Sequence, residues 1–422
     1  MPRRRPSRHA RANAGAYGVD TKGSDCLVIE MVCLWPRGDI RKLMTQANPQ
    51  GPKELAYLQV LRAYAALLVA VGHATLAAHG AELGAPSVGV LRDDVPLWGF
   101  GFGFGVDVFF VISGFIMAYV GGRNFGVRGA AGDFLARRII RIAPLYWLST
   151  LAVVGVGMVT PGSLNGAPPG GLEVATSLLF IPALDTSGAI LPVLPVGWSL
   201  NYEMFFYLVF SICMCLPRRF GLLALAGVLG LCVLLGVVFQ PESPPLKTWT
   251  NPLSLEFLFG VAIAVATMAG LTLRGWALAL LGLAAVLTSS LTVFLDIQLE
   301  TPRILADGAP AALLVLLAVT LPEPRPGVVM RGLTLLGNAS YSLYLTHLFT
   351  VRIVLKIWQA IGLHDLPAWL FTGVATLAAI STALLCYLLV ERPMTEWLKG
   401  RYAVIKSRLA TRRLASKHAR AD

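Results

Sequence analysis

The chain has 422 residues, of which 56% are apolar and only 14% are charged. Soluble globular proteins carry roughly 25% charged residues, so this composition excludes an ordinary soluble enzyme and indicates an integral membrane protein. The net charge of +12 would suit a nucleic-acid partner, but the positions of the basic residues explain it without one. The six cysteines lack metal-ligand spacing and four lie inside apolar runs, so we expect no metal site and no disulfide framework.

The N-terminal segment, residues 1–53, is polar and basic, and we expect it to be cytoplasmic and disordered. Its one apolar piece, residues 26–36, is too short to span a bilayer. This piece also lacks the apolar core and the small-residue cleavage site of a signal peptide. Met44 opens a stretch that runs into the first strong helix, so the choice between Met1 and Met44 as the true start stays open.

Ten apolar runs follow, most of them near the ~20 residues that a membrane span requires. The Pro- and Gly-rich stretch 161–195 is only partly apolar, and its piece 172–184 is too short for a span. The sequence therefore predicts an all-α, polytopic bundle of about ten transmembrane helices over residues 54–393, followed by a basic cytoplasmic tail, 394–422. The predicted spans are 57–79, 104–121, 142–160, 196–216, 221–239, 252–270, 275–295, 304–321, 334–357 and 368–390.

The basic residues fix the predicted orientation of these spans. With the N-terminus in the cytoplasm, 29 of the 35 Lys and Arg residues fall in cytoplasmic segments and Arg62 lies within the first span. Cytoplasmic loops of membrane proteins carry such an excess, so we expect both termini to be cytoplasmic. The anionic inner leaflet then accounts for the positive charge, and nucleic acid is not needed as a partner.

Charged side chains at membrane depth are costly, and each is a candidate functional residue. Arg62 and His73 lie eleven residues apart on the first span, which places them on one helix face about 16 Å apart in depth. Arg62 is predicted near the cytoplasmic face and His73 in the outer half. The alternative is that Arg62 reaches the lipid headgroups and that His73 bonds a neighbouring helix.

Further ionisable groups are expected at the same two depths. Asp107 and Glu203 lie toward the outside, and His347 lies near mid-depth. The alternatives are a carboxylate stabilised by its helix N-terminus for Asp107 and a hydrogen bond in helix packing for Glu203. For the arginines the alternative is an ordinary positive-inside anchor. Guanidinium groups at the inner face suit a phosphorylated cytosolic ligand, and histidine with carboxylates suits proton transfer, a carboxylate fixing the histidine tautomer. The inner arginines are Arg137, Arg138 and Arg141.

Six motifs, in order over most of the membrane region, resemble the integral-membrane acyltransferase family three. Arg62 and His73 reproduce its Arg-x10-His spacing, and Arg138 and Arg141 its Arg-x-x-Arg element. The end of the last span reads ERP, which is similar to the family's usual exit. The other three segments read GVDVFFVISGFIMAY (105–119), VGWSLNYEMFFYLVF (196–210) and GNASYSLYLTHLF (337–349).

The resemblance implies a multi-pass enzyme of the bacterial inner membrane that O-acylates sugars of cell-surface or exported polysaccharide, with most similarity to the exopolysaccharide-modifying branch. Cytosolic acyl-CoA, usually acetyl-CoA, would be the donor substrate, with no permanently bound cofactor. The acceptor would be a polysaccharide or a lipid-linked glycan, and polysaccharide-synthesis proteins are possible partners in the bilayer. The implied residues are His73, Glu203 and Asp107 for catalysis, Arg62, Arg138 and Arg141 for the donor, and His347, Ser113 and Tyr344 for the acceptor site.

Two other functions fit ten helices with buried charges. A transporter or flippase for a glycan or its lipid-linked precursor would also need ionisable groups at depth. Against it, the two halves show no internal repeat, and the Arg-x10-His and Arg-x-x-Arg elements have no evident transport role. A membrane sensor would normally carry a soluble output domain. The acceptor sugar, the acyl chain, the oligomeric state and the choice of His73 as base or acyl relay stay open.

Overall fold

The computed structural model describes residues 55–79, 103–159, 169–273, 275–294, 303–325, 327–363 and 366–418. Within these ranges every regular element is helical, and extended backbone pairs only in one isolated bridge, between Leu184 and Ile190. The predicted all-α fold is therefore confirmed. The predicted N-terminal segment, residues 1–53, lies outside the described residues.

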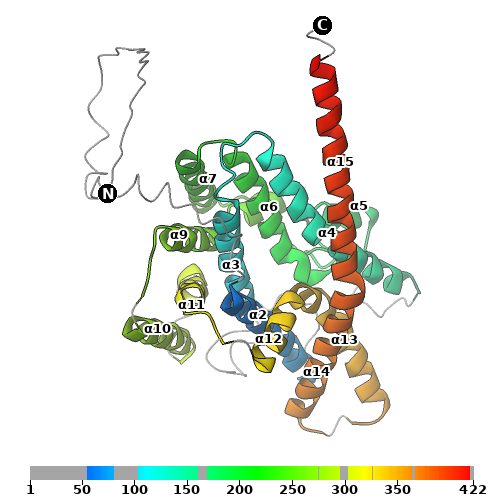
Figure 1. Ribbon diagram of the computed structural model, residues 1–422. Helices are drawn as coiled ribbons and strands as arrows, with labels where there is room; N and C mark the ends of the chain where they lie inside the picture. Colours follow the sequence, from blue (N-terminus) through cyan, green and yellow to red (C-terminus); the bar gives the residue numbers. More distant parts are fainter. Residues whose placement is uncertain are drawn as a thin grey trace, which may run out of the picture. The chain divides into compact units, whose positions relative to one another are not determined.

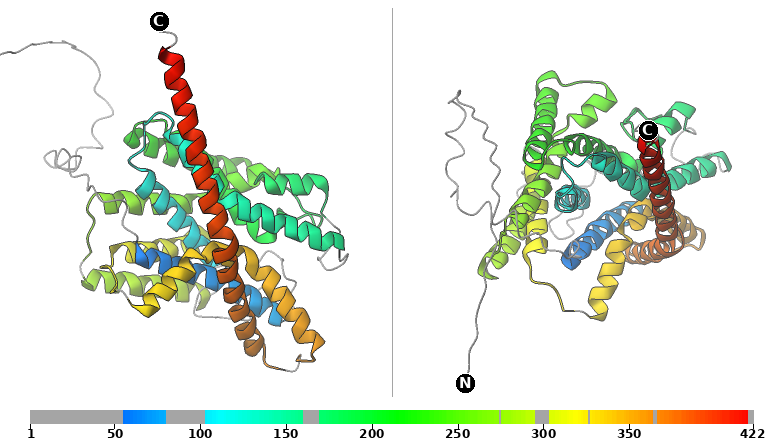
Figure 2. Two further views of the ribbon diagram at one scale, coloured as in Figure 1. Left: turned by 45° about the vertical axis from the view of Figure 1, so that its right-hand side comes forward. Right: turned by 45° about the horizontal axis from the view of Figure 1, so that its top comes forward.

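The chain order of the helices is followed most easily by colour (Figure 1). Helix α15 extends beyond the other helices toward the C-terminus (Figures 1 and 2). The elements are α2 (Ala56–Ala78), α3 (Phe104–Gly121), α4 (Ala130–Val159), α5 (Gly171–Leu178), η1 (Pro195–Gly197), α6 (Trp198–Cys213), α7 (Arg218–Phe239), α8 (Pro244–Trp249), η2 (Pro252–Leu255), α9 (Glu256–Met268), α10 (Gly275–Phe294), η4 (Ile304–Gly308), α11 (Ala309–Thr320), α12 (Val328–Asn338), α13 (Ser340–Ala360), α14 (Ala368–Cys386), η5 (Tyr387–Glu391) and α15 (Arg392–His418).

Each predicted span overlaps at least one of these helices, but fewer helices have the length and composition of a membrane crossing. Among the described residues, five helices do so: α2, α3, α4, α7 and the continuous helix Ala368–Arg408. Shorter apolar helices cover Pro252–Met268, Gly275–Ala284 and Ile304–Thr320. The number of ten crossings and the cytoplasmic position of the termini therefore stay predictions.

Helix α7 shows why the chain belongs in a bilayer. Its most apolar window has a mean hydropathy of 2.8, yet only 17% of that window is buried by the rest of the protein. Large apolar side chains such as Leu231, Leu234 and Phe239 are exposed along it. Such a surface is unstable in water and stable against lipid, so the protein is membrane-embedded.

Two helices run further than the apolar runs that predicted them. Helix α4 begins at Ala130, well before the predicted start at residue 142, and it contains Pro144. Helix α14 passes through the π-helical turn η5 into α15 and ends at His418, past the predicted exit at 390. Hydropathy detects only the apolar part of a helix, so it misses polar turns that continue the same backbone hydrogen bonding.

Helix α2 lies among α3, α12, α13 and α14. Its buried Ala66 and Ala70 pack with Ala379 and Ala383 of α14. Small side chains allow helix backbones to approach closely, which replaces the hydrophobic effect as a source of association in lipid. The close packing holds the polar residues of α2 in fixed positions.

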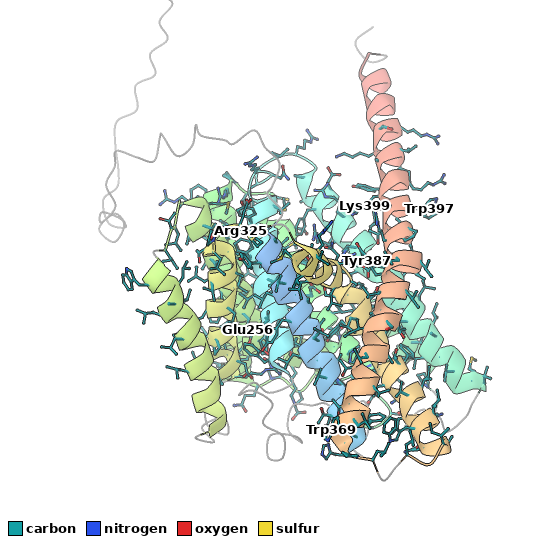
Figure 3. The ribbon with its side chains drawn as sticks, turned by 60° about the horizontal axis from the view of Figure 1, so that its bottom comes forward. Glu256, Arg325, Trp369, Tyr387, Trp397 and Lys399 are labelled. Carbon is teal, nitrogen blue, oxygen red and sulfur yellow. The ribbon has the colours of Figure 1, made fainter. Side chains whose placement is uncertain are left out.

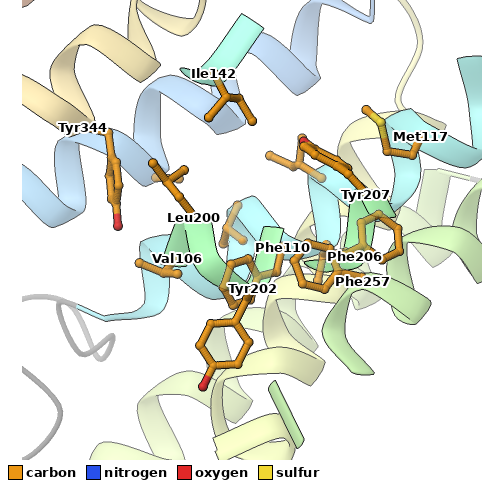
Figure 4. Packing of buried hydrophobic residues seen from close by; sticks show 14 of the residues in the cluster. Val106, Phe110, Met117, Ile142, Leu200, Tyr202, Phe206, Tyr207, Phe257 and Tyr344 are labelled. Atoms are coloured by element: carbon orange, nitrogen blue, oxygen red, sulfur yellow. The ribbon is translucent and has the colours of Figure 1, made fainter. Parts of the chain in front are cut away.

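Helices α3 and α9 cross at a reciprocal pair of glycines. A methyl group on Gly114 would overlap the backbone of Phe257, and one on Gly260 would overlap the backbone of Val111. The crossing brings Phe257 against Phe110 of α3. Figure 4 shows these rings beside Tyr202 and Tyr207, which leave α6 in different directions. Helix α6 therefore presents two distinct polar faces.

Candidate active site

Most of the predicted site residues line one cavity of about 130 Å³, which we call the arginine cavity. Six of the nine predicted residues contribute to it, from helices α2, α3, α4, α6 and α13. The six are Arg62, Ser113, Arg138, Arg141, Glu203 and Tyr344; Ser199, Tyr207, Ser340 and Tyr341 add further polar groups.

Helical spacing explains why these side chains face one another. Arg138 and Arg141 lie three residues apart on α4, and residues three or four apart share a helix face. On α6 the same rule aligns Ser199, Glu203 and Tyr207, four residues apart in each step. Each of these two motifs therefore supplies one wall of the cavity.

The cavity holds more cationic than anionic groups. Arg141 forms an ion pair with Glu391, which is fully buried and also accepts a hydrogen bond from Ser342 Oγ at 2.5 Å. Arg138 Nε is buried and has no hydrogen-bond partner among the described residues. A buried donor without a partner is costly, and a guanidinium group pairs strongly with phosphate or carboxylate. The arginine cavity therefore suits an anionic ligand.

Glu203 is the carboxylate that faces the cavity. Ser113 Oγ donates to Glu203 Oε1 at 2.5 Å, and Tyr207 OH donates to the same oxygen. No group among the described residues donates to Oε2, so this oxygen can accept a hydrogen bond from a substrate hydroxyl. We predicted Glu203 at the depth of His73, but the structure groups it with the arginines. The reason is that its helix face also carries Ser199 and Tyr207, which line the same cavity.

His73 and His347 form a buried pair beside this cavity. His347 Nε2 lies 3.3 Å from His73 Nδ1, and the ring centroids are 5.0 Å apart. His347 follows Tyr344 on α13, with ring centroids 6.2 Å apart, and Tyr344 lines the arginine cavity. Tyr344 OH donates to Val196 O at 2.7 Å, which fixes the ring between the cavity and the histidines.

The bonds of the pair determine which ring nitrogens carry hydrogen. Nδ1 of His347 lies 3.0 Å from Leu343 O and Nδ1 of His73 lies 2.9 Å from Val69 O, and a carbonyl can only accept. The one hydrogen on His73 Nδ1 is then shared between Val69 O and His347 Nε2, and the neutral His73 ring keeps its lone pair on Nε2. We expected a carboxylate to fix this tautomer; among the described residues a backbone carbonyl and a second histidine do so instead.

Asp107 lies apart from both groups. Its carboxylate is fully buried and accepts hydrogen bonds from Arg303, at 3.1 Å from Nε and 2.7 Å from the terminal nitrogen Nη2. Asp307 lies 3.7 Å from Arg303 Nε, and Glu256 is fully buried within the bundle (Figure 3). We call these four residues the carboxylate cluster. Its geometry gives Asp107 a role in holding α3 to η4.

Sequence reasoning assigned no site role to Glu391, Arg303 or Glu256, although Glu391 begins the ERP motif. Glu256 was detectable, because it is a charge inside the predicted span 252–270. Glu391 and Arg303 stand at the ends of predicted spans, where a charge is usually solvated. Only the tertiary structure shows that each is an ion-pair partner of a residue that the motifs did mark, Arg141 and Asp107 respectively.

Comparison with known proteins identifies the source of these motifs. The acyltransferase domain Acyl_transf_3 matches residues 55–391. The chain belongs to this family. The match covers every helix that lines the arginine cavity, and it makes the protein an acyltransferase.

Three relatives match the chain to different extents. The exopolysaccharide production protein ExoZ of Rhizobium meliloti (strain 1021) is 36% identical over 73% of this chain and 93% of its own length. The putative peptidoglycan O-acetyltransferase YrhL of Bacillus subtilis (strain 168) is 28% identical over 40% of the chain and 29% of its own. Protein 2 in the picA locus of Rhizobium radiobacter is 36% identical over 24% of the chain and 59% of its own. No solved structure matches the chain.

Proposed function

We propose that this acyltransferase moves an acetyl group from cytosolic acetyl-CoA to a sugar hydroxyl of a cell-surface or exported polysaccharide, at the bacterial inner membrane. The observation that carries the proposal is the arginine cavity, in which Arg62, Arg138 and Arg141 face Glu203. The names of ExoZ and YrhL, an exopolysaccharide protein and a putative O-acetyltransferase, support the acceptor class and the type of bond.

The arginines suit the donor. Coenzyme A carries phosphate groups, and guanidinium binds phosphate through paired hydrogen bonds. Glu391 offsets the charge of Arg141, so Arg62 and Arg138 remain to meet an anionic donor. The predicted topology puts these residues near the cytoplasmic face, where acetyl-CoA is available.

The histidine pair suits the chemical step. In the transfer, the acceptor hydroxyl loses its proton, its oxygen bonds to the acetyl carbonyl carbon, the carbon–sulfur bond breaks, and the thiolate takes up the proton as free CoA. His73 Nε2 can take the proton as general base or can first accept the acetyl group as nucleophile. Both roles need an unprotonated nitrogen, which the bonds around His73 provide. Ser113 and Tyr207 orient Glu203 toward the acceptor.

The test is the ester content of the host's surface polysaccharide in a deletion strain and in complements carrying wild type, His73→Ala or the matched control His79→Ala. Proton NMR of purified glycan, before and after mild base, detects O-acetyl groups directly. We expect the deletion and His73→Ala strains to make normal amounts of glycan without base-labile esters, because loss of a general base costs about 10²–10⁴-fold in rate.

His79 is the exposed residue that follows the last residue of the same helix, and its Nδ1 lies 2.9 Å from Thr75 O, so its variant should restore esters. If glycan export collapses in the deletion strain and the remaining glycan keeps its esters, the transporter function replaces the acyltransferase and His73 needs another role.

A further inference from the structure

A second cavity lies on the other face of α6. Its volume is about 220 Å³, far more than the 10–15 Å³ that one water needs. Helix α6 contributes Trp198, Asn201 and Tyr202, at the spacing that defines one helix face. The remaining polar lining comes from Lys247, Thr248, Asn251 and Arg303. None of these residues belongs to the arginine cavity.

Asn201 supplies the decisive observation. Its side chain is 3% exposed, it lines the second cavity, and its Oδ1 atom has no hydrogen-bond partner among the described residues. Leaving a buried acceptor unpaired destabilises the protein. A polar occupant of the cavity that reaches the side-chain amide of Asn201 would remove this destabilisation. Asn251, in contrast, already accepts a hydrogen bond from Leu253 N at 3.0 Å.

The walls suit a flat, hydroxyl-rich ring. Trp198 and Tyr202 lie edge to face with ring centroids 5.8 Å apart, and Arg303 lies 5.9 Å from the Trp198 centroid. Binding sites for small molecules combine aromatic walls with a few fixed polar groups in this way. Phe110 packs between the two cavities, because it lines the arginine cavity and its ring also lies 5.8 Å from Tyr202 and 6.4 Å from Trp198.

We propose that the second cavity is a subsite for the acceptor glycan, which holds a sugar next to the one that is acetylated and hydrogen-bonds it through the side-chain amide of Asn201. The inference rests on the proposed function. The predicted topology supports it, since Lys247 and Arg303 fall among the few basic residues expected on the outer side, where an exported glycan is found.

The test measures acetyl transfer by purified full-length protein from acetyl-CoA to fragments of the host's surface polysaccharide, freed of esters by mild base. Wild type should show a lower KM for fragments of two or more sugars than for single sugars. Asn201→Leu keeps the side-chain volume and should raise the KM for the longer fragments about tenfold, the equivalent of one hydrogen bond. The KM for acetyl-CoA and for single sugars should not change.

Asn124→Leu is the matched control, since Asn124 lies in the turn between α3 and α4 and lines neither cavity. The Tm of Asn201→Leu should equal or exceed that of wild type, because the change removes an unpaired buried oxygen. A wild-type KM independent of fragment length overturns the subsite and leaves the proposed function standing. The subsite is also wrong if Asn201→Leu changes only the KM for acetyl-CoA. Absence of transfer to every fragment overturns both proposals.

Discussion

The arginine cavity and the carboxylate cluster are built from the same residue types in opposite proportions. In the cavity, three arginines face Glu203, and Arg138 Nε and Glu203 Oε2 lack partners among the described residues. In the cluster, the single Arg303 is surrounded by Asp107, Asp307 and Glu256. Both are buried in one bundle, and both include a residue of α3.

This difference indicates that the arginine cavity binds a ligand and that the carboxylate cluster stabilises the fold. Buried charges are stable when they are paired and hydrogen-bonded within the protein, as Arg303 is. Unpaired groups occur at both sites, because both carboxylate oxygens of Glu256 are buried without a hydrogen-bond partner among the described residues. Glu256 lines neither cavity, whereas Arg138 and Glu203 line the arginine cavity, so only their unpaired groups can be stabilised by a ligand there.

The ion pairs alone would not distinguish the two sites, because Arg141 and Glu391 also form one. The two sites differ in whether their unpaired polar groups belong to residues that line a cavity. This difference predicts different responses to substitution.

Removal of the central cation should give the largest change. Arg303→Met removes the cation of this cluster and leaves the buried Asp107 without its ion-pair partner, so we expect the free energy of unfolding to fall by about 3–5 kcal/mol. Thermal unfolding of the purified protein in nanodiscs measures this. Arg219→Met, at an exposed site on α7, should stay within about 0.5 kcal/mol of wild type.

Asp107→Asn tests the same cluster from its anionic side. Because Asp307 and Glu256 remain beside Arg303, this variant should lose less stability than Arg303→Met. A transfer rate that vanishes in Asp107→Asn at unchanged Tm would contradict the scaffold role and would make Asp107 a catalytic residue, as the family resemblance implies.

Substitution of Glu203, the cavity carboxylate, should lower activity with little loss of stability, the reverse of what we expect for Arg303→Met. Glu203→Gln keeps an oxygen that accepts from Ser113 and Tyr207 but removes the negative charge. We expect kcat for acetyl transfer to fall by about 10²–10³-fold with little change in Tm. The exposed Glu242→Gln serves as control. A fall in Tm comparable to that of Arg303→Met would show that Glu203 is structural, and the comparison of the two sites would fail.

Sequence reasoning reached the fold class and most of the cavity, for a physical reason. Apolar runs predict helices directly, and residues three or four apart, such as Arg138 and Arg141, share a face without knowledge of the neighbours. The motifs carried Arg62, Ser113 and Glu203 as well. The motifs did not predict which helix faces pack together, because helix pairing in lipid depends on small-residue contacts such as those at Gly114 and Gly260.

Three features needed the tertiary structure for that reason. Glu203 joined the arginines rather than His73, a carbonyl and His347 replaced the expected carboxylate at His73, and Asp107 paired with Arg303. For His73 and Asp107 the sequence gives the depth of the side chain along its helix but not its direction around the bundle, whereas Glu203 lies with residues that were predicted at the other depth. Direction follows from the crossing of the helices.

Arg138 offers the finest comparison, since its neighbour provides the control. Arg138 lines the cavity with a buried Nε atom that has no partner among the described residues, whereas Arg137 on the next position of α4 is exposed. Hydrogen bonds to charged groups contribute about 1.5–3 kcal/mol, so Arg138→Gln should raise the KM for acetyl-CoA by about 10–100-fold. The KM of Arg138→Lys for acetyl-CoA should lie between those of wild type and Arg138→Gln, because lysine keeps the charge but not the planar pair of donors.

Arg137→Gln carries the same change of charge and should leave that KM within about twofold of wild type, since exposed charges interact weakly with ligands that they do not contact. Equal effects of the two glutamine variants would mean that the donor senses only the net charge of α4. The buried guanidinium would then be a helix anchor, and the arginine cavity would resemble the carboxylate cluster in function as well as in composition.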